Sequence, residues 1–393
     1  MMAYSVTMLE DLLQTLQSNG KDFASKQVFV GFDGFIDKIK KAIKQKAGKN
    51  TVFFKTLPEF SERINSASGK SGQIEMITQK VKLGGNAPIF ANTMGKLKVR
   101  TICFGSLGYP KPHSVFTDLN ENCEVMSVLN PGESDAIEFD DGKMIFSDLS
   151  VFEEYDWAYI KKTADMQRMS DAIRGSHLIA FLDWVNLPHA SDIWKGVLEE
   201  IIEPSGKRDF LFFFDLCDPT KKTTSQIKQT LKLISKFSQF GKVTLGLNEN
   251  EALKLWAAIK SAEGVSKDVA TPPVREAGAV IYQFMDIDCL LLHPSDRTIA
   301  FTKKEVLELK GNPVVNPKVL TGGGDNLNAG YCQGLLHGLP LSQCLLLGMA
   351  TAGAYIENGY SPGISDIIDH IETWIGNDAD SGKAHVTPKT AIA

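Results

Sequence analysis

Residues 210–216 read Phe-Leu-Phe-Phe-Phe-Asp-Leu (FLFFFDL) and form the most apolar strand-like stretch of the chain. An unbroken apolar run of this length is typical of a strand buried on both faces, because a strand with one solvated face alternates apolar and polar side chains. Strands buried on both faces belong to parallel sheets that carry a layer of helices on each side. The stretch therefore predicts an α/β fold.

Similar short apolar runs recur on both sides of this stretch, at Gln27–Gly31, Arg100–Gly105, His177–Leu182, Lys242–Leu247 and Cys289–His293. Helical patterns separate them, at Ala87–Leu97, Ala190–Ile202, Ser225–Phe237, Glu249–Lys260 and Pro273–Met285. The last third of the chain is helical, at Asn326–His337, Ser342–Asn358 and Ile364–Trp374. This alternation predicts a doubly wound, mostly parallel sheet.

Two stretches, at about residues 48–83 and 124–148, break the alternation with short β-like runs and turn signals. In the second, Asp141-Gly142 lies between β-forming residues, which is a strong hairpin signal. A small sheet inserted in this way predicts a β lid over a larger domain at 26–375. We expect a helical extension at 1–25, with Leu9, Leu12 and Leu16 on one side, and a loose polar tail at 376–393.

The composition of the 393 residues is that of an ordinary globular protein, with 43% apolar and 23% charged residues and a net charge of −5. No basic block or face predicts a nucleic-acid partner. The densest basic stretch, Lys38–Lys49, is interpreted as the solvated face of a helix.

The six cysteines are widely spaced and lack metal-ligand spacing, which favours free thiols in a reducing compartment. The longest apolar run, near Cys344 to Ile356, is shorter than the roughly 18 residues of a membrane helix. The early acidic residues Glu10 and Asp11 argue against a secretory signal. We therefore expect a cytoplasmic protein with no membrane partner.

The most informative polar segment is Val319–Gly338, in which Gly322, Gly323 and Gly324 precede Asp325 and a helix. Three glycines allow successive main-chain N–H groups to turn toward one point, and the helix adds its positive dipole end. This arrangement suits a phosphate, or the anion that develops in phosphoryl transfer, with Asp325 as the base for an attacking hydroxyl. A glycine turn with Asp325 only capping the helix is the alternative. The segment is neither a Walker A loop nor a dinucleotide-binding GxGxxG motif.

The segment resembles the C-terminal signature of PfkB-family, ribokinase-like carbohydrate kinases, which reads roughly DTxGAGDxFxAG. The resemblance implies that Gly322–Gly324 form the anion hole and that Asp325 is the catalytic base. Val319 and Leu320 stand where the family has Asp-Thr. Leu83–Asn92 (LGGNAPIFAN) is similar to the family's N-terminal signature GGNAxNxA, which implies a lid hinge at Gly84 and Gly85 and sugar contacts from Gly85 and Asn86.

Asp33 and Asp37 follow the first strand, at the sheet edge where doubly wound proteins bind ligands. From the residues alone, a sugar-binding pair and a helix cap plus a surface acid are equally good interpretations. The resemblance favours Asp37, then Asp33, as acceptor contacts, and the loop is similar to that of ADP-dependent glucokinases. Asn186, which ends another strand, is a further candidate for the sugar side.

The resemblance also implies a nucleotide and Mg²⁺ site. Asn248 and Glu251 match the family's NxxE motif, with Glu251 holding Mg²⁺ through water, although Asn248 is also a good helix cap. Asp218, or Asp215 close by, is the candidate for the phosphates, and Gly353 for the adenine pocket, where core packing explains a glycine equally well. His293-Pro294-Ser295 replaces the family's usual Thr-x-Gly.

These motifs together predict a sugar kinase that transfers the γ-phosphoryl of ATP to a hydroxyl, with Mg²⁺ as cofactor. ADP as donor, or a nucleoside or vitamin precursor as acceptor, are alternatives on the same fold. A non-catalytic sugar sensor is an alternative of another class. Because lid sheets in the family often pair, we expect a homodimer through the lid.

Overall fold

The computed structural model describes residues 6–18, 25–48, 50–261, 270–319 and 322–383. Within them, the strands are β1 (Gln27–Phe32), β2 (Phe35–Ala47), β3 (Asn50–Phe53), β4 (Met76–Gly84), β5 (Arg100–Gly105), β6 (Cys123–Ser127), β7 (Gly132–Phe139), β8 (Gly142–Asp148), β9 (Leu178–Phe181), β10 (Phe210–Asp215), β11 (Gly241–Leu247), β12 (Cys289–Leu292), β13 (Arg297–Thr302) and β14 (Val306–Lys310).

The helices are α1 (Val6–Ser18), α2 (Leu57–Asn65), α3 (Asn86–Lys96), α4 (Trp157–Thr163), α5 (Met166–Gly175), α6 (Ala190–Val197), α7 (Thr224–Lys236), α8 (Glu249–Lys260), α9 (Val274–Phe284), α10 (Gly323–Leu336), α11 (Leu341–Asn358) and α12 (Ile364–Lys383). Short helical turns lie at η2 (Ser114–Asp118), η3 (Ser150–Phe152), η4 (Leu198–Ile202), η5 (Glu203–Ser205), η6 (Pro219–Lys221) and η7 (Phe237–Gln239).

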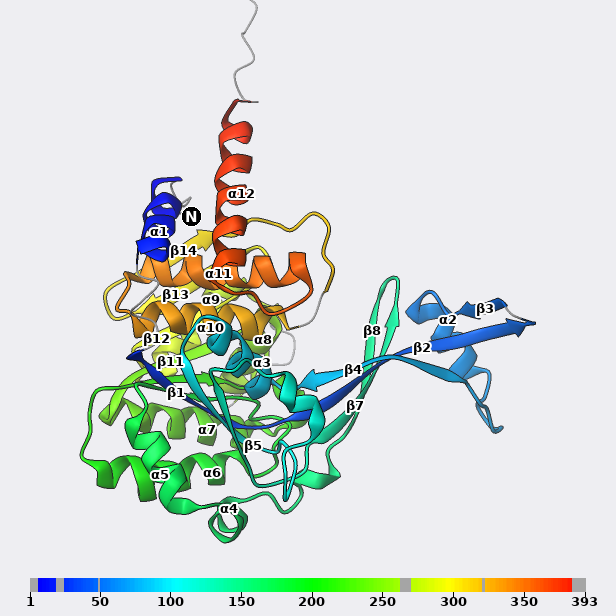
Figure 1. Ribbon diagram of the computed structural model, residues 1–393, viewed down its shortest axis with the longest axis horizontal. Helices are drawn as coiled ribbons and strands as arrows, with labels where there is room; N and C mark the ends of the chain where they lie inside the picture. The colour runs from blue at the N-terminus through cyan, green and yellow to red at the C-terminus, as the bar shows by residue number, and fades with distance from the viewer. Residues whose placement is uncertain (1–5, 19–24, 49, 262–269, 320–321, 384–393) are drawn as a thin grey trace, which may run out of the picture.

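The main sheet has the strand order β14-β13-β12-β11-β10-β9-β1-β5-β6 in the described chain. All neighbours from β12 to β6 pair in parallel, and β13 and β14 add an antiparallel edge. Helices cover both faces (Figure 1). The predicted doubly wound, mostly parallel α/β fold is therefore confirmed, whereas the two antiparallel edge strands were not predicted.

The apolar run of β10 shows why the sheet is buried on both sides. Phe212 and Phe214 of β10 belong to the core beneath α4–α9, and Phe213 belongs to the core on the opposite face with α1, α3, α10 and α11. All three rings are at most 1% exposed. Successive side chains of a strand point to opposite faces, so a run of phenylalanines fills two cores at once.

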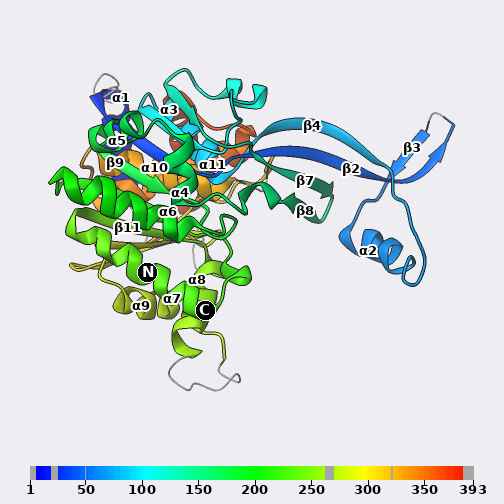
Figure 2. The same ribbon diagram turned by 90° about the horizontal axis from the view of Figure 1, so that it is seen from below.

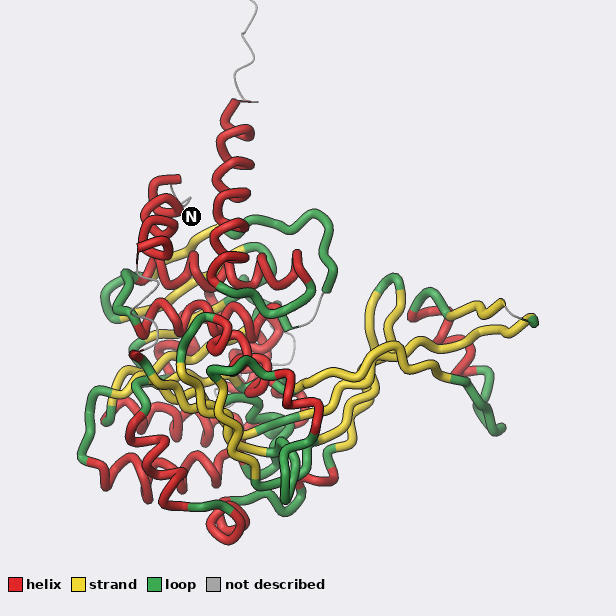
Figure 3. The backbone as a smooth tube through the Cα atoms, viewed as in Figure 1, coloured by secondary structure: helices red, strands yellow, loops and turns green. Residues whose placement is uncertain are grey.

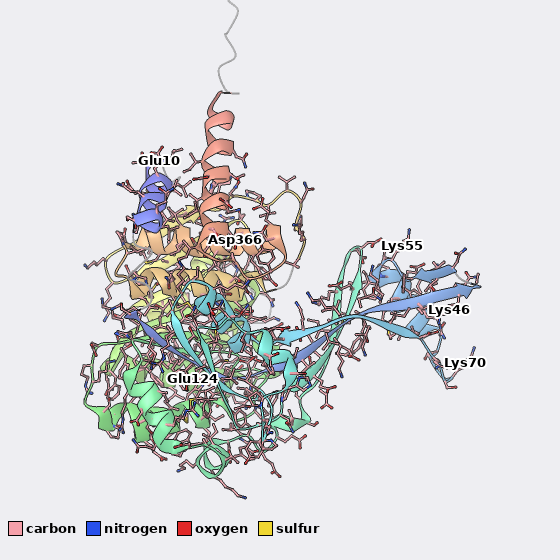
Figure 4. All side chains as sticks on the ribbon, in the orientation of Figure 1. Glu10, Lys46, Lys55, Lys70, Glu124 and Asp366 are labelled. Atoms are coloured by element: carbon pink, nitrogen blue, oxygen red, sulfur yellow. The ribbon has the colours of Figure 1, made fainter. Side chains whose placement is uncertain are left out.

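A second sheet, with β3, β2, β7 and β8 in order and β4 paired to β2, extends from one side of the body (Figures 1 and 2). We call this sheet, with α2 at its far end, the lid. It is built almost entirely from strands and loops (Figure 3). Lys46, Lys55 and Lys70 lie at its far end, remote from Glu124 on the body (Figure 4).

The interpretation of Lys38–Lys49 as a helix face was wrong, because residues 35–47 form the long strand β2; Lys49 lies outside the described residues. Lys38 and Lys40 form cross-strand ion pairs with Glu133 and Asp135 of β7, so pairing within the sheet overrides local helix propensity. The lid sheet accordingly begins at Phe35 rather than near residue 48.

Three other expected boundaries differ from the structure. β6 belongs to the main sheet, so the second lid segment begins at Gly132 rather than 124. Residues 376–383 continue α12 instead of forming a loose tail, and residues 384–393 lie outside the described chain. In the predicted N-terminal extension, α1 buries Leu9, Leu12 and Leu16 as expected, while residues 1–5 and 19–24 lie outside the described chain. Among the described helices, none is both long and apolar enough to span a membrane.

Candidate active site

The two glycine-containing signatures, more than 230 residues apart in sequence, meet at the starts of α3 and α10. The side-chain Nδ2 of Asn86 donates a hydrogen bond of 2.9 Å to Oδ1 of Asp325. About two turns further along α3, the Thr93 hydroxyl donates a hydrogen bond of 2.7 Å to Oδ1 of the fully buried Asn326. Asn326 in turn donates from Nδ2 to the Gly322 carbonyl over 2.7 Å. The glycine turn is therefore fastened to α3 through Asn326, a residue that the sequence did not single out.

The glycine triplet forms the N-terminus of α10. Gly322 is the N-cap, in the left-handed region with a φ of 87°, and Gly323 and Gly324 open the first turn. A side chain at Gly322 would lie 2.8 Å from the hydroxyl of Tyr355, so both the dihedral angle and the close contact require glycine. The first N–H groups of a helix have no partners within it and carry its positive dipole end. This turn therefore has the geometry of a helix N-terminus that can bind an anion.

Asp325 lies in the first turn of α10, at the mouth of the site. Burial raises its pKa well above the ordinary value, and the carboxylates of Asp215, Asp33 and Asp183 raise it further. The hydrogen bond from Asn86 acts in the opposite direction. A carboxylate whose proton affinity is raised in this way is suited to accept a proton from an alcohol.

Asp33 lies in the two-residue link between β1 and β2 and is completely buried. Its two oxygens accept hydrogen bonds of 2.7 and 2.9 Å from the main-chain N–H groups of Asn86 and Ala87, so it caps α3. A side chain at Gly85 would lie 2.5 Å from the same carboxylate, and Gly85 has a φ of 92°. The structure thus gives Asp33 a structural position at the hinge, next to Asp325.

Asp37 lies on β2 in the lid. Its carboxylate occupies the space beside Gly84, just as the Asp33 carboxylate occupies the space beside Gly85. Any side chain at Gly84 would overlap the Asp37 carboxylate. Burial raises the pKa of Asp37, and the nearby Lys82 and Lys143 lower it. No hydrogen bond to its carboxylate occurs within the described residues, so Asp37 keeps its capacity to accept bonds from a ligand.

Two further carboxylates lie near Asp325: Asp183 follows β9 by two residues, and Asp215 ends the neighbouring strand β10. Asp183 Oδ2 is buried without a hydrogen-bond partner. Asp215 accepts a bond of 2.8 Å from Asn328 of α10, and burial together with Asp183 raises its pKa to about 6. Asp183 was not predicted. The rule that carboxyl ends of parallel strands share one edge of the sheet is the signal that could have found it.

The residues predicted for the nucleotide side separate into two groups. Asn248 and Glu251 form a reciprocal capping box at the start of α8, with two bonds of 2.9 Å. Burial and then Asp215 raise the pKa of Glu251 to about 8. Asp218 instead forms an ion pair of 2.7 Å with Lys254 at the surface. Asp215, rather than Asp218, is therefore the carboxylate that adjoins Asp325.

Two other candidates are engaged within the protein. The side chain of Asn186 donates to Asp183 over 2.8 Å and accepts from Lys221 over 3.5 Å. Gly353 lies in α11 against the ring of His370, which would overlap any larger residue. Packing against His370 accounts for a glycine at this position.

A groove of about 580 Å³ runs along the start of α8 to the glycine turn; it is lined by Asn248, Glu249, Asn250, Leu253, His293, Pro294, Ser295 and Gly324. Burial lowers the pKa of His293 to about 4, so this side chain is neutral at physiological pH. No cluster of three or more His, Cys, Asp or Glu ligands with metal-site geometry occurs in the described parts of the chain. Carboxylates that are too few to enclose a metal, such as Glu251, suit a cation that keeps most of its water ligands.

Known structures share this fold. A probable sugar kinase from Rhizobium etli CFN 42 has a TM-score of 0.60 and 16% identity, and covers 89% of this chain and 98% of its own. A putative ribokinase II from E. coli, solved in complex with ATP and Mg²⁺, has a TM-score of 0.58 and 12% identity. The match covers 88% of this chain and 99% of the E. coli chain. The fold is that of the ribokinase-like (PfkB) carbohydrate kinases.

The sequence comparisons identify a narrower group of proteins than the fold does. A sequence model of the prokaryotic ketohexokinase family matches residues 8–374, and the chain belongs to that family. A ketohexokinase of Haloferax volcanii is 23% identical over 339 residues, which cover 86% of this chain and 88% of that protein. The predicted resemblance to PfkB carbohydrate kinases is confirmed.

Proposed function

We propose that this protein transfers the γ-phosphoryl group of ATP to a hydroxyl of a ketohexose, with Asp325 as the general base. The observation that carries the proposal is the position of Asp325 in the first turn of α10, next to the glycine turn and held by Asn86. The base and the anion-binding amides are therefore within one helical turn of each other. Membership of the prokaryotic ketohexokinase family and similarity to the Haloferax ketohexokinase support a ketohexose as the acceptor.

The chemistry follows from these positions. Asp325 takes the proton of the sugar hydroxyl as its oxygen bonds to the γ-phosphorus, and the bond from that phosphorus to the β,γ-bridging oxygen breaks to release ADP. The N–H groups of Gly323 and Gly324 stabilise the charge on the phosphoryl oxygens. Asp37 accepts hydrogen bonds from the sugar, while Asp33 and Asn86 keep the base and the hinge in place.

Asn248, Glu251 and the groove beside them form the nucleotide side of the proposed site. The mutual repulsion of Glu251, Asp215 and Asp218, which helps to raise the pKa of Glu251, fits a nearby cation. Glu251 would hold Mg²⁺ there through water, and the cation would supply positive charge beside the β- and γ-phosphates. The ATP and Mg²⁺ complex of the E. coli structure supports this assignment.

The Asp325→Asn variant tests the proposal. We expect turnover to fall by about 10²- to 10⁴-fold, the usual worth of a general base, while the ketohexose still binds. Asp286→Asn, which changes an exposed carboxylate paired with Lys303, is the matched control and should retain full activity. Wild-type turnover in Asp325→Asn would refute Asp325 as the base.

The same assay should be run with ATP and with ADP as donor, and with ketohexoses, nucleosides and vitamin precursors as acceptors. Turnover only with ADP, or only with a nucleoside, would select the corresponding alternative kinase. Binding of a ketohexose in a calorimeter without turnover of any nucleotide would identify a sugar sensor instead.

We further propose a cytoplasmic homodimer that forms through the lid. All six cysteines are free, which supports a reducing compartment. β8 ends the strand order of the lid sheet and exposes Met144, Ile145 and Phe146 by 44%, 51% and 52%. An exposed apolar edge strand is a ready surface for pairing with a second copy. Phe146→Lys should convert a dimer to a monomer in light scattering, and an unchanged mass would refute this interface.

A further inference from the structure

The inner surface of the lid carries a lysine that no motif identifies. Lys82 of β4 lies directly opposite Asp37 of the antiparallel neighbour β2, and Phe35 lies opposite Gly84. Residues that face each other across an antiparallel pair project from the same side of the sheet, as do residues two positions apart along a strand. Phe35, Asp37, Lys82 and Gly84 therefore share one face of the lid.

This face is the one turned toward Asp325. Burial raises the pKa of Tyr355 to about 12, and the charges of both Asp325 and Asp37 add to the rise, so the phenol lies near both carboxylates. The Tyr355 hydroxyl also lies against Gly322. The opposite face of β2 carries Lys38, which pairs with Glu133 of β7. Asp37 and Lys82 consequently lie on the side of the lid that faces the glycine turn and Asp325.

Lys82 differs in its surroundings from four lysines of the neighbouring strand β2, all of which are paired. Lys38, Lys40, Lys44 and Lys46 each form an ion pair with a glutamate or aspartate. Lys82 forms none within the described residues, although it is only partly exposed. Burial lowers its pKa, and Asp37 opposes that effect. The ammonium and carboxylate groups thus influence each other's ionisation without direct contact, and both keep hydrogen-bonding capacity.

A sugar hydroxyl satisfies both groups at once, because it has one proton to donate and lone pairs to accept. We propose that Lys82 is a sugar-binding residue that, together with Asp37, recognises a hydroxyl of the acceptor. The hydroxyl donates to the carboxylate of Asp37 and accepts from the ammonium of Lys82. This inference rests on the proposed function, in which Asp37 binds the acceptor.

The closeness of Lys82 to Asp37 also affects the pKa of Asp37. The charged or titratable groups around Asp37 are Lys82 on β4, Lys143 on β8 and Tyr355 on α11, and those around Lys82 also include Lys80 and Glu138. Lys82 stabilises the ionised form of Asp37 against burial. Without Lys82, Asp37 takes up its proton at a higher pH, and sugar binding weakens at a higher pH than in the wild type.

The experiment compares Lys82→Met, Lys82→Arg and the matched control Lys38→Met, which removes a lysine from the other face of the same sheet. A lost hydrogen bond from a charged group should raise the KM for the ketohexose by about 10- to 100-fold in Lys82→Met. kcat and the KM for ATP should change less than about twofold. Lys82→Arg should recover part of the loss, and Lys38→Met should resemble the wild type.

A second measurement follows ketohexose binding against pH by calorimetry in an Asp325→Asn background, so that Asp325 does not titrate. Lys82→Met should shift the acidic loss of binding to higher pH, which a merely structural role would not do. An unchanged KM and an unchanged pH profile, in an enzyme whose wild type phosphorylates the ketohexose, would overturn the role of Lys82 alone. Failure of the wild type to phosphorylate any ketohexose would overturn the proposed function and this inference together.

Discussion

The side-chain amide of Asn86 donates a hydrogen bond of 2.9 Å to the carboxylate of Asp325, while the main-chain N–H of the same asparagine donates to Asp33 over 2.7 Å. One residue therefore contacts both the proposed base and the acid of the hinge. The bond from its side chain favours the ionised form of Asp325, the form that can accept a proton.

Replacing Asn86 by Ala should move the acidic limb of kcat to higher pH. Burial and the surrounding carboxylates already raise the pKa of Asp325, and loss of the amide removes a contact that lowers it. The main-chain bond to Asp33 persists in the variant. The measurement is kcat against pH, with Asn92→Ala of the same helix as the control. An acidic limb at the same pH in all three proteins would contradict the assignment.

Gly84→Ala should weaken binding of the sugar. A methyl group at this position overlaps the Asp37 carboxylate and displaces it. We expect a higher KM for the ketohexose and an unchanged KM for ATP in steady-state kinetics. Gly376→Ala in α12 is the control, because a side chain there meets no other atom within 4 Å. Equal KM values for the sugar in both variants would show that Asp37 does not bind it.

Thr93→Val should destabilise the protein by about 1–3 kcal/mol, the cost of leaving a buried polar group unpaired. The lost hydroxyl is the donor to Oδ1 of Asn326, which fastens the glycine turn. Urea unfolding measures the change, and kcat should fall as the turn loosens. Thr93→Ser keeps the hydroxyl and should retain most of the stability. A valine variant as stable as the serine variant would rule out this role for the bond.

Asp215→Asn should raise the melting temperature at pH 8, with a gain that shrinks toward pH 5. The pKa of Asp215 is raised to about 6 in the folded protein from an ordinary value of 3.8, so its ionised form is less favourable there than in the unfolded chain. Its contribution to stability is full below about pH 4 and is lost as the pH rises through 6.

Asp218→Asn provides a control of opposite sign. Burial alone would raise the pKa of Asp218, but the bonds from Lys254 and Thr220 outweigh it and hold the pKa at about 2. The ionised carboxylate therefore adds to stability above about pH 4, by an amount that exposure keeps small. Differential scanning calorimetry across this pH range measures both variants. A loss of stability at pH 8 in Asp215→Asn would contradict the prediction.

The sequence predicted the main sheet well because its signal is local. Each of Phe212, Phe213 and Phe214 must be buried whichever face it occupies, so the apolar run alone identifies a central strand. The lid was harder to predict. The lysines of β2 are suited to a solvated helix, and the ion pairs that stabilise the strand come from β7, about 95 residues away.

The candidate active site could be predicted from the sequence where a single motif contains several of its residues. The glycine turn and Asp325 are contiguous, so their relation is visible in the sequence. Asp215 and Asp218 are equally plausible there, and only the fold shows that Lys254 of α8 pairs with Asp218. The placement of Lys82 opposite Asp37 depends on a strand register that shifts between Ile39 and Lys40, which the sequence does not indicate.

The link between β1 and β2 consists of only Asp33 and Gly34, and Gly34 accepts a hydrogen bond from Gly132, where β7 begins. The lid is thus joined to the body by a short link next to Asn86, which also contacts the proposed base, while thirteen residues of β2 extend outward from it. At about 3.3 Å per residue, that strand is a lever arm of roughly 40 Å. A protein or surface that displaces the far end of the lid would therefore also act on this short link. The displacement would reach the place where a sugar would be held.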